Sequence, residues 1–166
     1  MGIMKKGICL ILALLLLVSF GLFALGSGES STDDQGSGES SATESKANLG
    51  DCNIEIKSCR LAEDYEGKKV VIVTYGYTNY DETATSFMMA VNDQVYQNGV
   101  GLNESYFVAE SANYSSDNQS KEIKKDATLD VEVAYELNDE TTDIEVEVTE
   151  FISFDDKKVT KTFTIA

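Results

Sequence analysis

The strongest constraint on the fold is a repeated alternation of apolar and polar residues between Asp51 and Ala166. Successive side chains of a β-strand point to opposite faces of a sheet, so a period of two predicts strands with one buried face. The apolar face of the clearest run consists of Leu129, Val131, Val133, Tyr135 and Leu137. Comparable runs cover residues 52–56, 71–77, 87–91, 144–148 and 159–165.

Two of these runs also indicate where the strand lies in its sheet. Val70 and Ile72 are apolar on the face opposite Val71 and Val73, which predicts an inner strand that is partly buried on both sides. Lys161 falls among the inward-facing residues of the last run. A lysine in that register predicts an edge strand, where its ammonium group can reach water.

Turn signals separate the predicted strands. Glu66-Gly67 and Asn98-Gly99 are turn dipeptides, and the second is flanked by apolar residues as in a tight hairpin. The polar segment 103–120 reads as a long connection that has room for one short helix. About seven short strands in one domain predict an all-β fold, an antiparallel β-sandwich, with a closed barrel as the alternative.

The beginning of the chain has a different character. Residues 1–26 contain Lys5-Lys6, an apolar run from Gly7 to Leu25 and the small residues Ala24 and Gly26, a pattern typical of a signal peptide or of a retained N-terminal membrane anchor. Residues 27–50 are rich in Ser, Gly and Glu, which predicts a disordered linker. The sandwich domain is then expected over 51–166, on the extracellular side of the membrane or secreted.

The charge balance restricts the partners. The chain has a formal net charge of −16 and a pI near 4.2, so phosphate-rich nucleic acid and anionic lipid headgroups would be repelled. We therefore expect no nucleic-acid partner, and membrane contact only through the N-terminal segment if it is not cleaved. The oligomeric state is left open.

Cys52 and Cys59 are separated by seven positions in a predicted strand. A fully extended strand would hold them about 23 Å apart, whereas a disulfide needs Cα atoms closer than about 7 Å. The strand therefore predicts two free thiols, with an internal bridge or a bond to another chain as the alternatives. Cys52 falls on the inward face, and Cys59 can be buried only if the strand contains a bulge.

No catalytic or cofactor-binding residues are expected. The chain contains no histidine, which excludes Ser–His–Asp and Cys–His arrangements, and we predict a protein that is not an enzyme. A metal site is left open, because the oxygen-rich loops Asn138–Asp143 and Asp155–Asp156 could bind calcium if they converge at one end of the sandwich. The alternative is that these Asn and Asp residues serve to make turns.

Several stretches together resemble a domain of unknown function, numbered 5067, found in exported proteins of Gram-positive bacteria. They are Lys69–Asn79, Thr85–Phe87, Tyr96–Val100, Ala134–Asp139 and Ile144–Val148. The resemblance implies an immunoglobulin-like sandwich on a tethered, often lipid-anchored, surface protein. In lipoprotein signals a cysteine follows the small residue, but here Ser27 follows Gly26. The resemblance brings no known activity, ligand or catalytic residue.

The expected function is binding of an extracellular protein or glycan by a non-enzymatic, exported domain. A binding module predicts a concave or aromatic patch, which we expect near Tyr96–Tyr114, because exposed tyrosines are common contact residues. A structural spacer would instead have a uniformly polar surface, and a calcium-stabilised adhesion domain would use the oxygen-rich loops.

Overall fold

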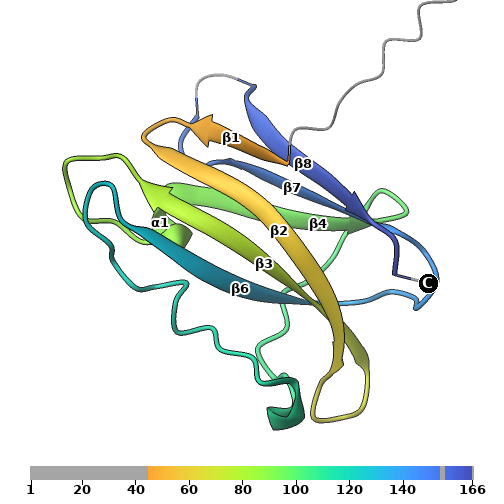
Figure 1. Cartoon of the computed structure of the whole chain (residues 1–166). Coiled ribbons are helices and arrows are strands. Elements are labelled where there is room, and N and C mark those ends of the chain that lie inside the picture. Colours follow the sequence, from red (N-terminus) through yellow and green to blue (C-terminus); the bar gives the residue numbers. More distant parts are fainter. Residues whose placement is uncertain (1–44, 154–155, 166) are drawn as a thin grey trace, which may run out of the picture. The chain divides into compact units, whose positions relative to one another are not determined.

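The computed structural model describes residues 45–153 and 156–165, and these form two antiparallel four-stranded sheets packed face to face (Figure 1). The first sheet has the order β1 (Lys46–Leu49), β2 (Cys52–Glu63), β3 (Lys69–Asn79) and β6 (Thr128–Glu136). The second has the order β5 (Val100–Gly101), β4 (Val91–Gln97), β7 (Ile144–Glu150) and β8 (Lys158–Phe163). The predicted all-β sandwich is confirmed.

The core lies between the sheets and uses the inward set of each alternating run. From β6 it receives Val131, Val133 and Tyr135, and from β7 Ile144, Val146 and Val148, all at most 3% exposed. Burying each of these side chains contributes about 1.5–3 kcal/mol. The alternation along these strands therefore supplies the main stabilising surface of the fold.

A bulge in β2 places both cysteines near the core. Ile56 pairs with Tyr75 and Ser58 pairs with Thr74, so Lys57 is an extra residue in the ladder. The extra residue shifts the alternation by one position. Cys59 consequently faces inward beside the core cluster, half-buried, while Cys52 is fully buried. The bulge that burial of Cys59 required is present.

The outer face of the first sheet is partly covered by the long connection between β5 and β6. Val70, Ile72 and Ala134 are buried on this face beneath Val108, with Ala112 and Tyr114 packed against them. The connection includes the short 3-10 helix η1 (Glu110–Ala112). Because this connection covers the outer face of the first sheet, β3 is apolar on both faces, as predicted for an inner strand.

The domain begins earlier than predicted. Lys46–Leu49, which composition assigned to the disordered linker, forms β1 and pairs with the first residues of β2. The tight turn at Gly50, with φ of 54°, makes this hairpin feasible, and Leu49 is buried in the core. A four-residue strand contains too few apolar residues to stand out from a polar linker.

The strand predicted over residues 87–91 is wrong except for its last residue. Phe87–Ala90 forms a helical turn, α1, and the strand β4 begins only at Val91. Of this turn only Phe87 is buried, and its ring packs against Tyr75 and Tyr77 with centroid distances of 5.2 and 6.1 Å. Met89 is exposed, so its match to the period of two was accidental.

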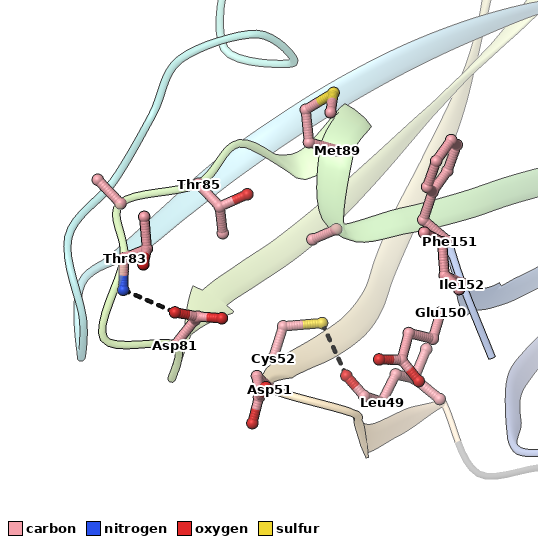
Figure 2. A pocket seen from close by; sticks show the side chains of 12 residues that line it. Leu49, Asp51, Cys52, Asp81, Thr83, Thr85, Met89, Glu150, Phe151 and Ile152 are labelled. Carbon is pink, nitrogen blue, oxygen red and sulfur yellow. Dashed lines mark hydrogen bonds between the residues drawn. The ribbon is translucent and has the colours of Figure 1, made fainter. Parts of the chain in front are cut away.

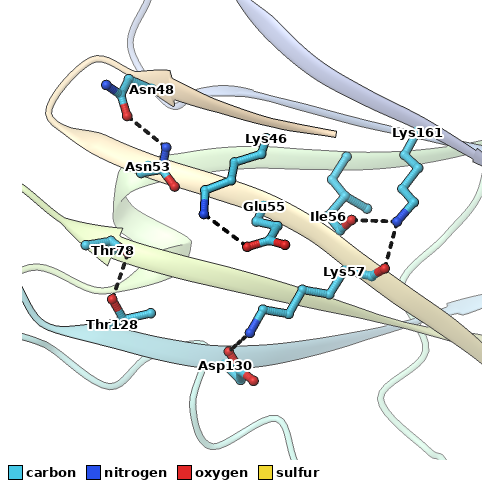
Figure 3. A network of polar contacts seen from close by, with 10 residues as sticks. All are labelled: Lys46, Asn48, Asn53, Glu55, Ile56, Lys57, Thr78, Thr128, Asp130 and Lys161. Carbon is cyan, nitrogen blue, oxygen red and sulfur yellow. Dashed lines mark hydrogen bonds and ion pairs between the residues drawn. The ribbon is translucent and has the colours of Figure 1, made fainter. Parts of the chain in front are cut away.

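β8 is an edge strand, as the position of Lys161 predicted, but Lys161 does not point freely into water. Its Nζ donates hydrogen bonds to the carbonyl oxygens of Ile56 and Lys57 in the opposite sheet (Figure 3). The first residue of β1, Lys46, pairs with Glu55, so these two carbonyls lie just past the stretch of β2 that β1 covers. The lysine therefore closes a free edge.

Among the described residues there is no helix of the length and apolarity needed to cross a membrane. The predicted signal or anchor segment 1–26 lies outside the described residues, and so does the linker as far as residue 44.

Candidate functional site

One end of the sandwich contains a cavity of about 350 Å³, here called the end pocket (Figure 2). It is lined by residues from the β1–β2 turn (49–52), the loop after β3 (81–85), the last residues of α1 (89–90) and the turn after β7 (150–152). This volume falls at the small end of the range of ligand pockets and suits one side chain or a compact group.

Backbone hydrogen bonds tie these segments to one another. The N–H of Tyr80 donates to the carbonyl of Asp51 at 2.8 Å, which joins the β1–β2 turn to the end of β3. The N–H of Phe151 donates to the carbonyl of Ala90 at 3.0 Å, which joins the turn after β7 to α1. The walls of the end pocket are thus held in place before any ligand enters.

Asn79 organises the loop that follows β3. It is completely buried, and its side-chain amide donates to the carbonyls of Thr83 and Ile123, both at 2.9 Å. Its side-chain oxygen accepts the N–H of Asp81, whose carboxylate in turn accepts the N–H of Thr83. The loop is therefore a hydrogen-bonded turn with Asp81 at a defined position in the pocket wall.

The outer rim of the end pocket is apolar. Met89, Phe151 and Ile152 line it and are 62%, 55% and 68% exposed. Single exposed apolar residues are common on protein surfaces, but a group of large ones around a cavity is characteristic of interaction sites. This rim is the apolar part of the candidate site.

The floor of the end pocket is formed by Cys52, whose thiol donates to the carbonyl of Leu49 at 3.1 Å. Burial, followed by the negative charges of Glu150 and Asp51, raises the pKa of this thiol to about 12. A thiol in this environment stays protonated near neutral pH and is a poor nucleophile. Cys52 is thus a structural residue of the floor.

Behind the floor lies the buried hydroxyl of Tyr77. Burial and, next, the neighbouring Cys52 raise the pKa of Tyr77 to about 12, while a hydrogen bond from the Thr85 side chain opposes the rise. Thr85 lines the end pocket, so this hydroxyl belongs to the layer of the core behind the pocket wall.

Three carboxylates line the end pocket, those of Asp51, Asp81 and Glu150. Among residues 45–153 and 156–165, no Lys or Arg forms an ion pair with any of them. The same residues contain no group of three or more His, Cys, Asp or Glu placed to hold a metal ion. The pocket therefore has a negative potential that is spread over its wall.

The first predicted calcium loop is organised by a glutamine. Gln97 is 1% exposed; its amide donates to the carbonyls of Asp139 and Thr142, and its oxygen accepts the N–H groups of Asn138 and Asp139. The Asp139 carboxylate accepts the N–H groups of Thr141 and Thr142, and these hydrogen bonds lower its pKa. These oxygens thus already have protein donors, as in an ordinary turn.

The two loops also do not converge as a shared calcium site requires. Asn138–Asp143 precedes β7, whereas the second loop follows it, so they lie at opposite ends of that strand. Asp155 lies outside the described residues, and Asp156 is exposed. The idea of one calcium site built from both loops is therefore wrong.

The predicted patch near Tyr96–Tyr114 is not one continuous surface. Tyr114 packs over the outer face of the first sheet, and its hydroxyl accepts a hydrogen bond from Gln119. Tyr106 is 75% exposed, beside a shallow depression that Asp93 and Tyr135 also line. There the Tyr135 hydroxyl donates to the Asp93 carboxylate, so these polar groups satisfy each other. A separate hollow of about 400 Å³ is lined by the exposed rings of Phe107 and Tyr65, so part of the expected range does form a concave aromatic surface.

Sequence reasoning missed the residues of the end pocket. The signal that could have found them is the failure of alternation after β7, where Phe151 and Ile152 are two consecutive apolar residues in a turn. Met88-Met89 is a second such pair, and both pairs are exposed in the structure. Large apolar residues in turns indicate either a local cluster or a contact surface.

Comparison with known families gives one match. The model of the family described as Domain of unknown function (DUF5067) matches residues 27–150, well over half of the chain. The chain belongs to this family. The DUF5067 match ends at the last residue of β7, so β8 and the rim residues Phe151 and Ile152 lie outside the matched range. No curated protein is significantly similar to the chain.

Proposed function

We propose that this chain is an exported, non-enzymatic DUF5067 protein whose sandwich, immunoglobulin-like in architecture, binds an extracellular partner through the end pocket. The observation that carries the proposal is the exposed apolar rim of Met89, Phe151 and Ile152 around a cavity whose walls are joined by backbone hydrogen bonds. Preformed pockets that combine apolar area with a few polar groups are typical binding sites.

Two features support a binding role over catalysis. The chain has no histidine, and the one thiol in the end pocket stays protonated because its pKa is raised to about 12. The Cys52 thiol of the pocket already donates its proton to the carbonyl of Leu49, and neither histidine nor lysine is among the described residues that line the cavity. The site thus offers shape, apolar area and charge.

The extracellular location rests on the residues that precede the domain. The Lys5-Lys6 start, the apolar run and the small residues at 24 and 26 are typical of export. The strongly acidic chain is consistent with a soluble domain outside the cell that avoids anionic membrane surfaces. We therefore place the domain at the cell surface or in the secreted fraction.

The proposal is tested with a photo-crosslinking amino acid introduced at Ile152 of the full chain, in the cells that express it. The matched control carries the same amino acid at Thr162, an exposed position on β8 that does not line the end pocket. We expect a discrete cross-linked product from position 152 and none from position 162.

Two results would contradict this function. One is the same set of products from both positions, and the other is a product at 152 that persists at full yield in the double variant Met89→Ser and Phe151→Ser. Either would favour the alternative, a structural spacer without a specific ligand.

A further inference from the structure

The end pocket contains three carboxylates that have no basic partner among the described residues, and this charge restricts the chemistry of its ligand. Asp51, Asp81 and Glu150 line one cavity, and no basic residue of the described ranges forms an ion pair with any of the three. On the outer sheet faces, by contrast, Glu55, Asp130 and Glu132 are paired with Lys46, Lys57 and Arg60. A positive group on the ligand would supply the counter-charge that the pocket lacks.

Glu150 is held against the turn that forms the opposite wall. A Cβ atom at Gly50 would overlap its Oε1, so the carboxylate occupies the space that a side chain at position 50 would need. Glu150 and Asp51 also both act on the Cys52 thiol at the floor. Two segments far apart in the sequence thus both contribute negative potential at the floor of the pocket.

The three pocket carboxylates are not arranged as a metal-binding site. The described ranges contain no group of three His, Cys, Asp or Glu placed to share one ion. Hard divalent cations require several oxygen ligands at short and similar distances. A dispersed negative wall is better matched to an organic cation, whose charge is bulky and whose donors point in several directions.

The apolar rim limits the cation further. Met89, Phe151 and Ile152 stand outside the charged wall and would contact an aliphatic stem whose charged head lies inside. Lysine and arginine side chains have this amphipathic form. A free polyamine fits less well, because its regularly spaced charges would place a second ammonium group against the apolar rim.

We infer that the end pocket accepts the lysine or arginine side chain of an extracellular polypeptide, with the charged head among Asp51, Asp81 and Glu150 and the stem on the apolar rim. This inference rests on the proposed binding function and names the chemistry of the partner. The partner is then a protein with an exposed basic residue, since a neutral glycan would not supply the counter-charge that the three carboxylates lack.

The test uses the full chain in detergent micelles and three small probes, N-acetyl-lysine amide, N-acetyl-arginine amide and the uncharged N-acetyl-norleucine amide. Binding is followed through the methyl NMR signals of Met89 and Ile152. We expect saturable shifts with one or both cationic probes, weakened by added salt, and no saturable shift with the norleucine probe. The better of the two cationic probes identifies the side chain.

Charge-removing variants locate the interaction. Glu150→Gln and Asp51→Asn should each weaken cationic-probe binding about two- to fivefold, the range for a partly exposed charge pair. The matched control is Glu145→Gln, which removes one exposed charge from the outer face of β7 and should leave binding unchanged. Unchanged thermal midpoints in all three variants show that the fold is retained.

The inference is overturned if the norleucine probe binds as well as the cationic probes, or if neither cationic probe binds at the highest concentration tested. It is also overturned if the two pocket variants bind the cationic probe as tightly as the control variant does. The proposed function has its own readout, the cross-link from position 152. A cross-link that survives Glu150→Gln and Asp51→Asn together refutes the cationic ligand and leaves the binding site intact.

Discussion

The Nζ atom of Lys161 lies 2.9 Å from the carbonyl oxygen of Ile56, and this contact joins an edge strand of one sheet to the bulged strand of the other (Figure 3). The same ammonium group donates to the carbonyl of Lys57 at 2.7 Å and lies 4.8 Å from the centroid of the Phe163 ring. A lysine in a core-facing register thereby satisfies carbonyls that the short strand β1 leaves without a partner.

Replacing Lys161 by methionine should destabilise the domain by about 1–3 kcal/mol. Methionine keeps the stem but removes the donors, so two partly buried carbonyls lose charge-assisted hydrogen bonds. The measurement is the free energy of unfolding from urea titrations followed by circular dichroism. The control is Lys158→Met, which removes an exposed ion pair with Glu147 and should cost less than about 1 kcal/mol. Equal effects of the two variants would refute the bridging role.

Gly50→Ala should destabilise the β1–β2 turn by about 1–3 kcal/mol. The backbone has a φ of 54°, and the added methyl group would collide with the Glu150 carboxylate. Gly67→Ala is a matched control, because its φ of 81° is also strained for alanine but nothing lies within 4 Å of the new atom. The difference between the two unfolding free energies isolates the collision, and no difference would show that Glu150 moves away freely.

Asp93→Asn should make the domain more stable near neutral pH. Asp93 lies on the inward side of β4, where burial, then Glu104, raises its pKa, although the Tyr135 and Tyr75 hydroxyls favour the ionised form. A carboxyl whose pKa is higher in the folded state holds a proton that the unfolded chain releases. Stability therefore falls as pH rises through the interval between the ordinary carboxyl pKa and the raised one.

Asparagine cannot ionise, and its oxygen still accepts the hydrogen bond from Tyr135. The thermal midpoint of Asp93→Asn should exceed that of the parent by a few degrees at pH 7, and the two should agree near pH 3. Glu145→Gln, at an exposed position, serves as the control with no such dependence. If the parent domain instead became more stable relative to Asp93→Asn as the pH rises above the ordinary carboxyl pKa, the raised pKa of Asp93 would be contradicted.

Iodoacetamide at pH 8 should modify Cys59 slowly and leave Cys52 unmodified in the folded protein. Both thiols are free, but Cys52 is fully buried and has a pKa of about 12, so its thiolate fraction at this pH is on the order of one in ten thousand. Cys59 is half-buried, and burial raises its pKa. Peptide mapping by mass spectrometry reports each site, and unfolding in urea should make both react fully.

Rapid labelling of Cys52 in the folded protein would show that the floor of the end pocket opens to solvent. A mass that fits a Cys52–Cys59 bridge would contradict the extended strand β2.

The regular strands could be predicted because their evidence is local. The alternation from Leu129 to Tyr135 and from Ile144 to Val148 requires only that one face be buried, and both became strands with that face in the core. The hairpin at Asn98-Gly99 was visible for the same reason, since both residues adopt the positive φ that this dipeptide favours. Local geometry was sufficient at these places.

The prediction failed where a residue's role depends on distant parts of the chain. Met89 matched a strand pattern but lies on a helical turn, because Phe87 packs onto Tyr75 and Tyr77 instead of continuing a ladder. Gln97 looked like an ordinary strand residue, yet its amide holds the β6–β7 loop that oxygen content had suggested for calcium. The contacts of Phe87 and of Gln97 are with residues distant in the sequence, so they cannot be predicted from neighbouring residues.

The order of residues alone determined that this chain builds sheets, that its Cys52 and Cys59 stay apart, and that it carries a large net negative charge, because strand period and charge are local or additive properties. Only the tertiary structure decided that the turns at Gly50, Asp81 and Phe151 meet around one acidic cavity with an apolar rim. Gly50 and Phe151 are 151 − 50 = 101 positions apart along the chain, and only the pairing of the strands that carry these turns brings them together.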